Sequence, residues 1–196
     1  MNRTEILQKV KEAMPEKRYI HTLGVEKQAI RLAKHYGENV EKASLAALLH
    51  DYAKYTELKT QQAIIVQEKM DPRLLSYHAS LWHAPVGSFF AKNEFGVEDP
   101  AILEAIRVHT TGKIGMSRLD KILYLADYTE ENRDFPGVEK ARELVFQSLD
   151  QAMLYALGRT IIFLVSKNSP IFPDTFEAYN DFSSKTIKGD VNEFDE

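Results

Sequence analysis

The 196-residue sequence contains no cysteine, which excludes both a disulfide framework and a thiolate metal site. It also lacks a run of about 18 to 20 uncharged residues, so we expect no segment that spans a bilayer. The first residues contain no apolar stretch typical of a secretory signal, and we expect a cytoplasmic protein. No block of lysine and arginine is present and the net charge is −4, which disfavours nucleic acid binding through a basic face.

Hydrophobic residues make up 44% of the chain, which is enough for one sizeable core. They recur every three to four positions, and we find neither a useful alternating strand pattern nor an internal repeat. We therefore predict an all-α fold with a single domain over residues 1–182. Asp174-Thr175 is expected to cap a short last helix, and the polar residues 183–196 are expected to form a mobile tail.

Capping residues predict where several helices begin. Asn39 is expected to cap a helix that ends at His50, and Pro85 is expected to open another. After Val138 the apolar spacing predicts one long helix, or two joined near Gly158. The apolar surface of this region could face a partner chain as easily as the core, so a homodimer stays open beside a monomer.

Histidines and carboxylates lie where these apolar stretches end or point inward. His50 and Asp51 follow directly after the run Leu45 to Leu49, and His21 lies on the apolar face of its helix. Each is ambiguous when considered alone. A His-Asp pair at a helix end is more often a cap with an ion pair, and a lone inward histidine is more often a core residue bonded to a carbonyl.

The same placement recurs along the chain, and this recurrence favours a common site. The residues are His21, His50 with Asp51, His83, His109 and Asp127. Burying such groups without partners would cost about 2–7 kcal/mol each. If they converge, they supply four imidazoles and two carboxylates, enough for two six-coordinate divalent transition-metal ions with open positions for water or substrate.

The order and the flanks of these residues resemble those of the HD-domain phosphohydrolases, an all-helical superfamily of metal-dependent phosphatases and phosphodiesterases. The flanks look most like the YqeK group, bacterial enzymes that cleave diadenosine tetraphosphate (Ap4A) symmetrically into two ADP. The matching stretches are Arg18 to Val25, His50 to Lys54, Trp82 to Gly87, His109 to Gly112, Leu125 to Tyr128 and Asn132 to Val138. The resemblance runs from Arg18 to about Asn180, and Glu131, where we expect proline, is a small departure.

The resemblance implies an HD-type helical bundle that binds two metal ions, with iron as the expected metal and manganese or others left open. It implies one ion held by His21, His50, Asp51 and Asp127, and a second held by His83 and His109, with Asp51 as the bridge. Two divalent ions outweigh two carboxylates, which explains how an acidic protein could hold a polyphosphate. A metal-activated water would attack phosphorus in line, and the ions would stabilise the charge that develops on the phosphoryl oxygens.

The resemblance also assigns roles around the ions. Asp51, Lys54, His83 and His109 are the expected catalytic residues. The expected substrate-binding residues are Arg18, His21, Lys54, His83, His109, Thr110, Asp127, Arg133, Pro170, Ile171, Phe172, Pro173, Asp174 and Thr175. Lys54 and Arg133 are expected on phosphate oxygens, with ordinary surface ion pairs as the alternative. For residues 170–175 the alternative is a helix-capping loop.

Two other functions stay open. The first is a broader nucleotide phosphatase or phosphodiesterase on the same site, because a fold does not fix the substrate. The second is a metal-dependent nucleotide-binding regulator without turnover. The complete ligand set argues against the regulator, since a protein that only binds nucleotide does not need two ions with open positions.

Overall fold

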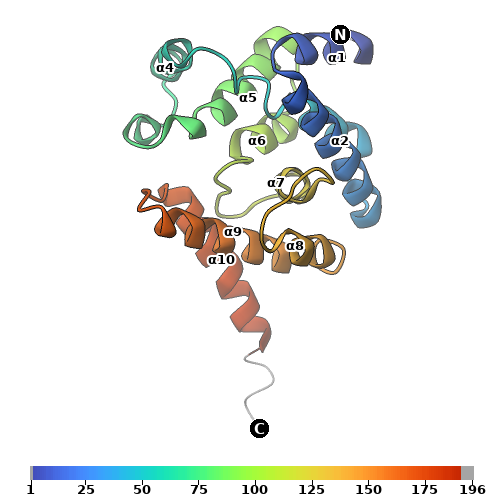
Figure 1. Ribbon diagram of the computed structural model, residues 1–196, viewed down its shortest axis with the longest axis vertical. Coiled ribbons are helices and arrows are strands. Elements are labelled where there is room, and N and C mark those ends of the chain that lie inside the picture. The colour runs from blue at the N-terminus through green and yellow to red at the C-terminus, as the bar shows by residue number, and fades with distance from the viewer. Residues whose placement is uncertain (1, 191–196) are drawn as a thin grey trace.

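The computed structural model describes residues 2–190, with side chains for residues 2–185, and Figure 1 shows an assembly of helices. This part of the chain forms ten α-helices and two 3-10 helices and contains no strand, which confirms the all-α prediction. The elements are α1 (Arg3–Glu12), α2 (Glu16–Tyr36), α3 (Val40–Leu49), α4 (Leu58–Gln67), η1 (Pro72–Ser76), η2 (Ala79–Leu81), α5 (His83–Phe95), α6 (Pro100–Val108), α7 (Arg118–Thr129), α8 (Val138–Leu144), α9 (Leu149–Ser166) and α10 (Pro173–Asp190).

Capping residues set several helix ends as predicted. The Asn39 side chain accepts a hydrogen bond from the Lys42 backbone N–H at 2.9 Å and so begins α3, which ends at Leu49 with His50 as its C-cap. The predicted start of α5 was wrong by two residues, because α5 begins at His83 and not at Pro85. Proline is tolerated in the first turn since the N–H groups there have no partner within the helix.

The region after Val138 forms two helices, but Gly158 does not join them. The break lies between α8 and α9, where the Ser148 side chain accepts from the Gln151 backbone N–H at 3.3 Å and caps α9. Gly158 lies inside α9, where a Cβ would come within 3.4 Å of Tyr179 on α10. The glycine therefore allows close packing of α10 on α9.

The last helix is longer than predicted. α10 begins at Pro173 and continues to Asp190, so the expected boundary before residue 183 falls inside a helix. Phe182 is 1% exposed and packs into the core, while the exposed Lys185 forms an ion pair with Asp181 one turn earlier. Polar residues on the outer face are thus compatible with a surface helix. Residues 191–196 of the predicted tail lie outside the described residues.

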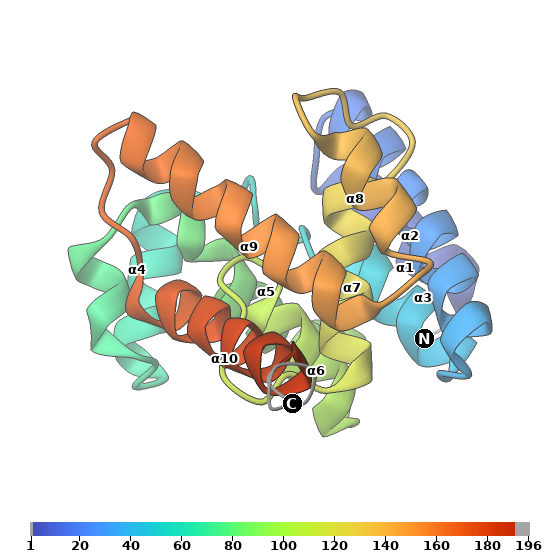
Figure 2. The same ribbon diagram turned by 90° about the horizontal axis from the view of Figure 1, so that it is seen from below.

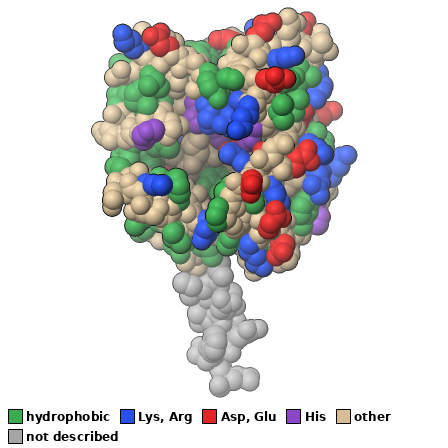
Figure 3. Space-filling view, viewed as in Figure 1, with side chains coloured by type: hydrophobic (Ala, Val, Ile, Leu, Met, Phe, Trp, Pro, Cys, Tyr) green, Lys and Arg blue, Asp and Glu red, His purple; other side chains and the backbone are tan. Residues whose placement is uncertain are grey.

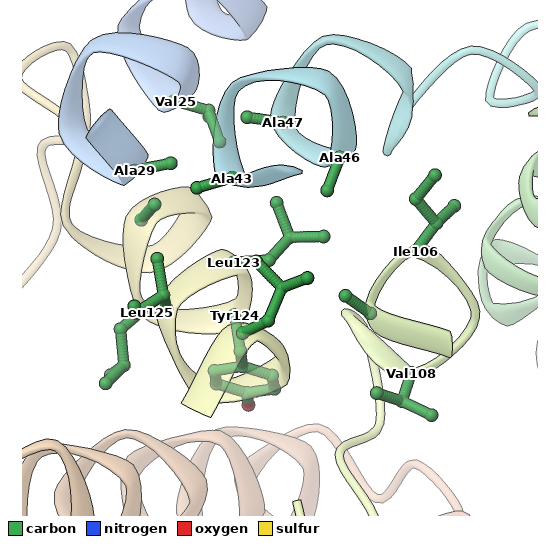
Figure 4. Close-up of a cluster of buried hydrophobic side chains, with 14 of the residues drawn as sticks. Val25, Ala29, Ala43, Ala46, Ala47, Ile106, Val108, Leu123, Tyr124 and Leu125 are labelled. Atoms are coloured by element: carbon green, nitrogen blue, oxygen red, sulfur yellow. The ribbon is translucent and has the colours of Figure 1, made fainter. Parts of the chain in front are cut away.

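Helix α7 lies in the middle of the bundle and packs against α2, α3, α6, α8 and α9. Figure 4 shows how its Leu123, Tyr124 and Leu125 meet side chains from α2, α3 and α6. The facing residues of α3 include the small Ala43 and Ala47, which let the helices approach closely. This packing brings the C-terminal ends of α3, α6 and α7 together.

Helix α9 is, within the described residues, the one helix long and apolar enough to cross a membrane by length and composition. Its first half is built into the core through Ala152, Met153, Ala156 and Leu157. Its second half leaves other apolar side chains exposed, namely Ile162, Phe163 and Val165. The expectation that no segment spans a bilayer therefore stays a prediction.

Candidate metal centre

The helix ends place all six predicted metal ligands in one location. Two groups of side chains offer ligand atoms that lie within 4.8 Å of one another: His21, His50 and Asp127 form one, and His50, Asp51 and His109 the other. His21 comes from the inner face of α2, His50 and Asp51 follow α3, His83 opens α5, His109 follows α6, and Asp127 lies in the last turn of α7. The helix packing that shields these side chains from water also places them next to one another.

Asp51 stands between two sets of imidazoles and is 1% exposed. Its Oδ1 lies 3.0 Å from His83 Nε2 and 3.8 Å from His109 Nε2. Its Oδ2 lies 3.3 Å from His50 Nε2 and 3.8 Å from His21 Nε2. Each oxygen of a single carboxylate thus faces a different pair of histidines, which is the arrangement that a bridging ligand requires.

Asp127 completes one of the two sets. Its Oδ1 lies 3.0 Å from His21 Nε2 and 3.9 Å from His50 Nε2, and it also forms an ion pair with Arg133. Burial alone would raise the pKa of Asp127, but its contact with His21 and the charge of Arg133 hold this pKa well below the ordinary value. The side chain is therefore an ionised carboxylate, the form in which it can bind a cation.

Backbone carbonyls fix the orientation of three of the rings. A carbonyl can only accept, so each Nδ1 bonded to one carries a proton, and in the neutral ring the lone pair is then on Nε2. The three contacts are His50 to Ala47 O at 2.6 Å, His83 to Ser80 O at 2.7 Å and His109 to Ile106 O at 2.7 Å. Outer hydrogen bonds of this kind are typical of histidines that bind metal through Nε2.

The inner nitrogen atoms are left in positions that fit a metal ion. The Nε2 atoms of His83 and His109 lie 3.2 Å apart, and burial lowers the pKa of His109 to about 4, so its ring is neutral at pH 7. Two lone pairs at this distance repel unless a proton or a metal ion lies between them. The buried Nε2 atoms of His21 and His50 face carboxylate oxygens, at 3.0 Å for Asp127 Oδ1 and 3.3 Å for Asp51 Oδ2. Imidazole nitrogen and carboxylate oxygen together suit a divalent transition ion.

The orientation of His21 depends on Glu130, which our sequence analysis did not identify. Glu130 is 1% exposed, and its Oε1 lies 3.0 Å from His21 Nδ1. Its Oε2 accepts from the backbone and side-chain N–H groups of Asn132 at 2.8 and 3.0 Å. A Cβ on Gly24 would overlap this oxygen, so the glycine one turn after His21 leaves room for the carboxylate. That glycine was the one sequence signal that could have indicated it.

Three cationic side chains predicted to contact substrate lie at the edge of the ligand cluster. Lys54 Nζ is 3.1 Å from Asp51 Oδ1, and Arg18 Nη1 is 3.0 Å from Asp51 Oδ2. Arg133 pairs with Asp127 and donates to its backbone carbonyl at 2.9 Å. All three remain partly exposed, and Figure 3 shows lysine and arginine side chains beside histidines at a hollow in one face. Their partners are carboxylates of the site, which sets them apart from ordinary surface ion pairs.

Arg142 of α8 holds the loop that carries Arg133, and no local sequence pattern indicated this role. Its Nε donates to Thr129 O at 3.0 Å, and its Nη2 donates to Glu130 O at 2.7 Å and to Arg133 O at 2.8 Å. The carbonyls of Thr129 and Glu130 lie at the C-terminal end of α7, where helical partners are missing, and the carbonyl of Arg133 lies in the loop that follows. Arg142 is thus a positioning residue for both Glu130 and Arg133.

The remaining predicted substrate-binding residues differ in the cavity that they line. Thr110 lines the same cavity of about 350 Å³ as His83, His109 and Asp127, and its buried Oγ1 has no hydrogen-bond partner among the described residues. Phe172 and Asp174 instead line an adjoining cavity of about 320 Å³, which also includes Thr110. Four other residues of the predicted segment line neither cavity, namely Pro170, Ile171, Pro173 and Thr175.

The segment 170–175 is held in place by contacts of its own. The Phe172 ring lies 5.1 Å from the Tyr77 ring, and Arg73 pairs with Asp174 at 2.7 Å. Pro173 is the first residue of α10, so the segment also begins a helix. The stretch therefore includes a helix start, as the helix-capping alternative predicted, and it also lies next to the site; contact with a nucleotide stays a prediction.

Comparisons with known proteins show the family of this chain. Residues 18–132 match the family profile described as HD domain. The chain is 49% identical over 180 residues to a Bacillus subtilis (strain 168) protein named "Bis(5'-nucleosyl)-tetraphosphatase, symmetrical", covering 92% of this chain and 97% of that protein. A Staphylococcus aureus (strain NCTC 8325 / PS 47) protein of the same name is 36% identical over 194 residues, covering 97% and 100%.

A solved structure shows the same fold. The crystal structure of a predicted HD superfamily hydrolase involved in NAD metabolism, from Clostridium acetobutylicum, superposes with a TM-score of 0.91 at 36% sequence identity. The match covers 94% of this chain and 98% of that one. The likeness therefore extends over nearly the whole bundle and is not confined to the ligand cluster.

Proposed function

This chain belongs to the HD domain family, and within it to the YqeK-type group of its curated relatives, and from that premise we propose that it cleaves Ap4A symmetrically into two ADP. The relatives that cover most of the chain carry the name of this activity. The observation that supports the proposal most strongly is the position of Asp51, with one oxygen toward His83 and His109 and the other toward His50 and His21.

We propose iron as the metal, with Asp51 shared between two ions. His21, His50 and Asp127 would hold one ion, and His83 and His109 the other. When bound, such ions supply Lewis acidity, which acidifies a coordinated water and stabilises negative charge on phosphoryl oxygens. The protein fixes the rings for this purpose through the carbonyl contacts of Nδ1, so no proton has to move before an ion can bind.

The cations at the edge of the cluster would bind the polyphosphate. Arg133 presents a guanidinium that can contact two phosphate oxygens, and Lys54 presents a compact charge. Both now neutralise carboxylates of the site, and each is about one third exposed, at 32% for the Arg133 side chain and 33% for that of Lys54. A tetraphosphate that enters the cavity can therefore reach them without any helix moving.

Thr110 would add a hydrogen bond to the substrate. Its Oγ1 is buried within the cavity, next to His109, and makes no hydrogen bond in the described structure. An unpaired buried hydroxyl is costly, and a phosphate oxygen would remove this cost. Phe172 and Asp174 lie beyond Thr110, so a nucleoside extending in that direction would meet the segment 170–175.

Product analysis tests the proposal. Metal-replete protein is incubated with Ap4A, and the nucleotides are resolved by anion exchange. ADP as the sole product supports symmetrical cleavage, whereas AMP together with ATP contradicts it. Measurable binding without turnover would support a nucleotide-binding regulator instead.

A matched pair of variants links the activity to the site. Asp51→Asn removes the charge that faces all four histidines and is expected to abolish turnover. Asp134→Asn makes the same chemical change at an exposed loop residue and is expected to leave turnover unchanged. Equal activity of the two variants would contradict the role of the centre.

A further inference from the structure

The cavity lined by His83, His109 and Asp127 adjoins other cavities on two separate sides. It shares Leu81 and Thr110 with the cavity that contains Phe172. It shares Tyr128, Arg133, Phe135 and Thr160 with a third cavity of about 570 Å³, which we call the α9 groove. The two outer cavities have no lining residue in common. The ligand cluster therefore lies between two separate spaces.

The α9 groove is formed by α9 and by the loop between α7 and α8, which Figure 2 shows beside each other. Hydrogen bonds hold the loop to the helix: Tyr155 Oη donates to Gly137 O at 3.1 Å, and Arg159 Nη2 donates to Pro136 O at 3.2 Å. Gly137 has φ of 95°, and a Cβ there would lie 2.6 Å from Tyr155 Oη. The groove is thus built by close packing of the loop on the helix and does not depend on a ligand.

The chemistry of the groove combines aromatic rings with guanidinium groups. Phe163 lines it with 59% of its surface exposed, and the rings of Tyr128 and Phe135 lie 4.9 Å apart. Arg159 and Arg133 line it as well, and Arg133 also borders the ligand cluster. Nucleic acid bases stack on aromatic and guanidinium planes, and phosphates bind guanidinium groups. An apolar partner helix would offer no anionic group to these two guanidinium groups.

We propose that the α9 groove binds the second nucleoside of a dinucleoside polyphosphate, with its base stacked on Phe163 and its phosphates passing Arg133. This inference rests on the proposed function. A substrate that is cut in its middle has a nucleoside on each side of the reacting phosphorus, so a centre with a cavity on each side accommodates both halves. The volume of about 570 Å³ lies within the range typical of small-molecule sites.

The test compares two exposed apolar residues of α9. Phe163→Ala removes the stacking ring, and Val165→Ala is the control, because Val165 is equally exposed, at 60%, but does not line the groove. With Ap4A as substrate, Phe163→Ala is expected to raise KM by about tenfold, the scale of one base stacked on one ring. We expect little change in kcat, since the lost contact is made in the ground state and the transition state alike.

Three results would overturn the inference. Phe163→Ala with the KM of the wild type would show that the base does not stack there, and an equal rise in KM for Val165→Ala would show an effect that is not specific to the groove. A fall in molar mass from dimer to monomer in Phe163→Ala, measured by light scattering, would make the groove a subunit interface. If the wild type releases no ADP from Ap4A, the proposed function itself is contradicted. If the wild type releases ADP but Phe163→Ala has the KM of the wild type, only the inference about the α9 groove is contradicted.

Discussion

Replacing Glu130 by glutamine tests whether the ligand cluster is preorganised by the protein. The Glu130 carboxylate accepts from Asn132 through Oε2 and lies 3.0 Å from His21 Nδ1 through Oε1. A carboxylate can only accept, so it requires the proton of His21 on Nδ1 and leaves Nε2 free to bind a metal ion. Glutamine has the same shape but has a donor at one of the two positions.

Neither orientation of the glutamine amide preserves this arrangement. If its oxygen accepts from Asn132, its NH2 group faces His21 Nδ1, and the ring must move its proton to Nε2, where it blocks the ion. If its oxygen faces His21, its NH2 group opposes two donors of Asn132, and two hydrogen bonds worth about 0.5–1.5 kcal/mol each are lost. We therefore expect Glu130→Gln to weaken metal binding by about 10- to 100-fold, or about 1.4–2.8 kcal/mol.

Calorimetric titration of metal-free protein with Fe²⁺ or Mn²⁺ measures this effect. Glu130→Gln is expected to weaken one of two binding events, because His83 and His109 do not contact Glu130. The control is Glu131→Gln, whose side chain is 59% exposed and pairs with Lys27 at 2.7 Å. If Glu130→Gln binds both ions as tightly as this control does, the preorganisation argument is refuted.

Three further variants probe the same centre. Asp51→Ala is expected to lose the metal ions and the activity while far-ultraviolet circular dichroism shows the helical fold intact, and retention of two ions per chain would exclude a bridging role. Gly24→Ala is expected to displace Glu130 and to reproduce the loss of metal affinity seen with Glu130→Gln, and unchanged affinity would show that the close packing at Gly24 has no functional role. Arg142→Ala leaves three carbonyls without their donor and is expected to lower the free energy of unfolding by about 1–3 kcal/mol, and to raise KM through Arg133; a wild-type KM would count against its positioning role.

The ligand cluster could be predicted from sequence because helical periodicity is local. His21 and His109 share a face with apolar residues that must be buried, and His50 and Asp51 follow an apolar helix directly, so burial of the polar group follows from its neighbours. The glycine at position 24 is also visible locally, but the group that approaches it is the Glu130 side chain, which comes from another helix end and could not be identified from the local pattern.

Features that depend on distant contacts could not be predicted. Glu130 lies in a polar stretch that resembles a solvated helix end, and only the fold places it beside His21. The break between α8 and α9 was not visible because Val145, within the break, and Leu149, directly after it, are both buried and continue the apolar spacing. The length of α10 likewise depends on the burial of Phe182, which the polar residues around it obscure.

Hydrolysis of Ap4A in water enriched in oxygen-18 tests the central claim most directly, since mass spectrometry of the products identifies both the bond that is cut and the attacking oxygen. The account predicts ADP as the sole product, with one labelled oxygen on the terminal phosphate of half of the ADP molecules. It predicts no turnover by Asp51→Asn in the same medium. AMP together with ATP, or ADP without label, would contradict it.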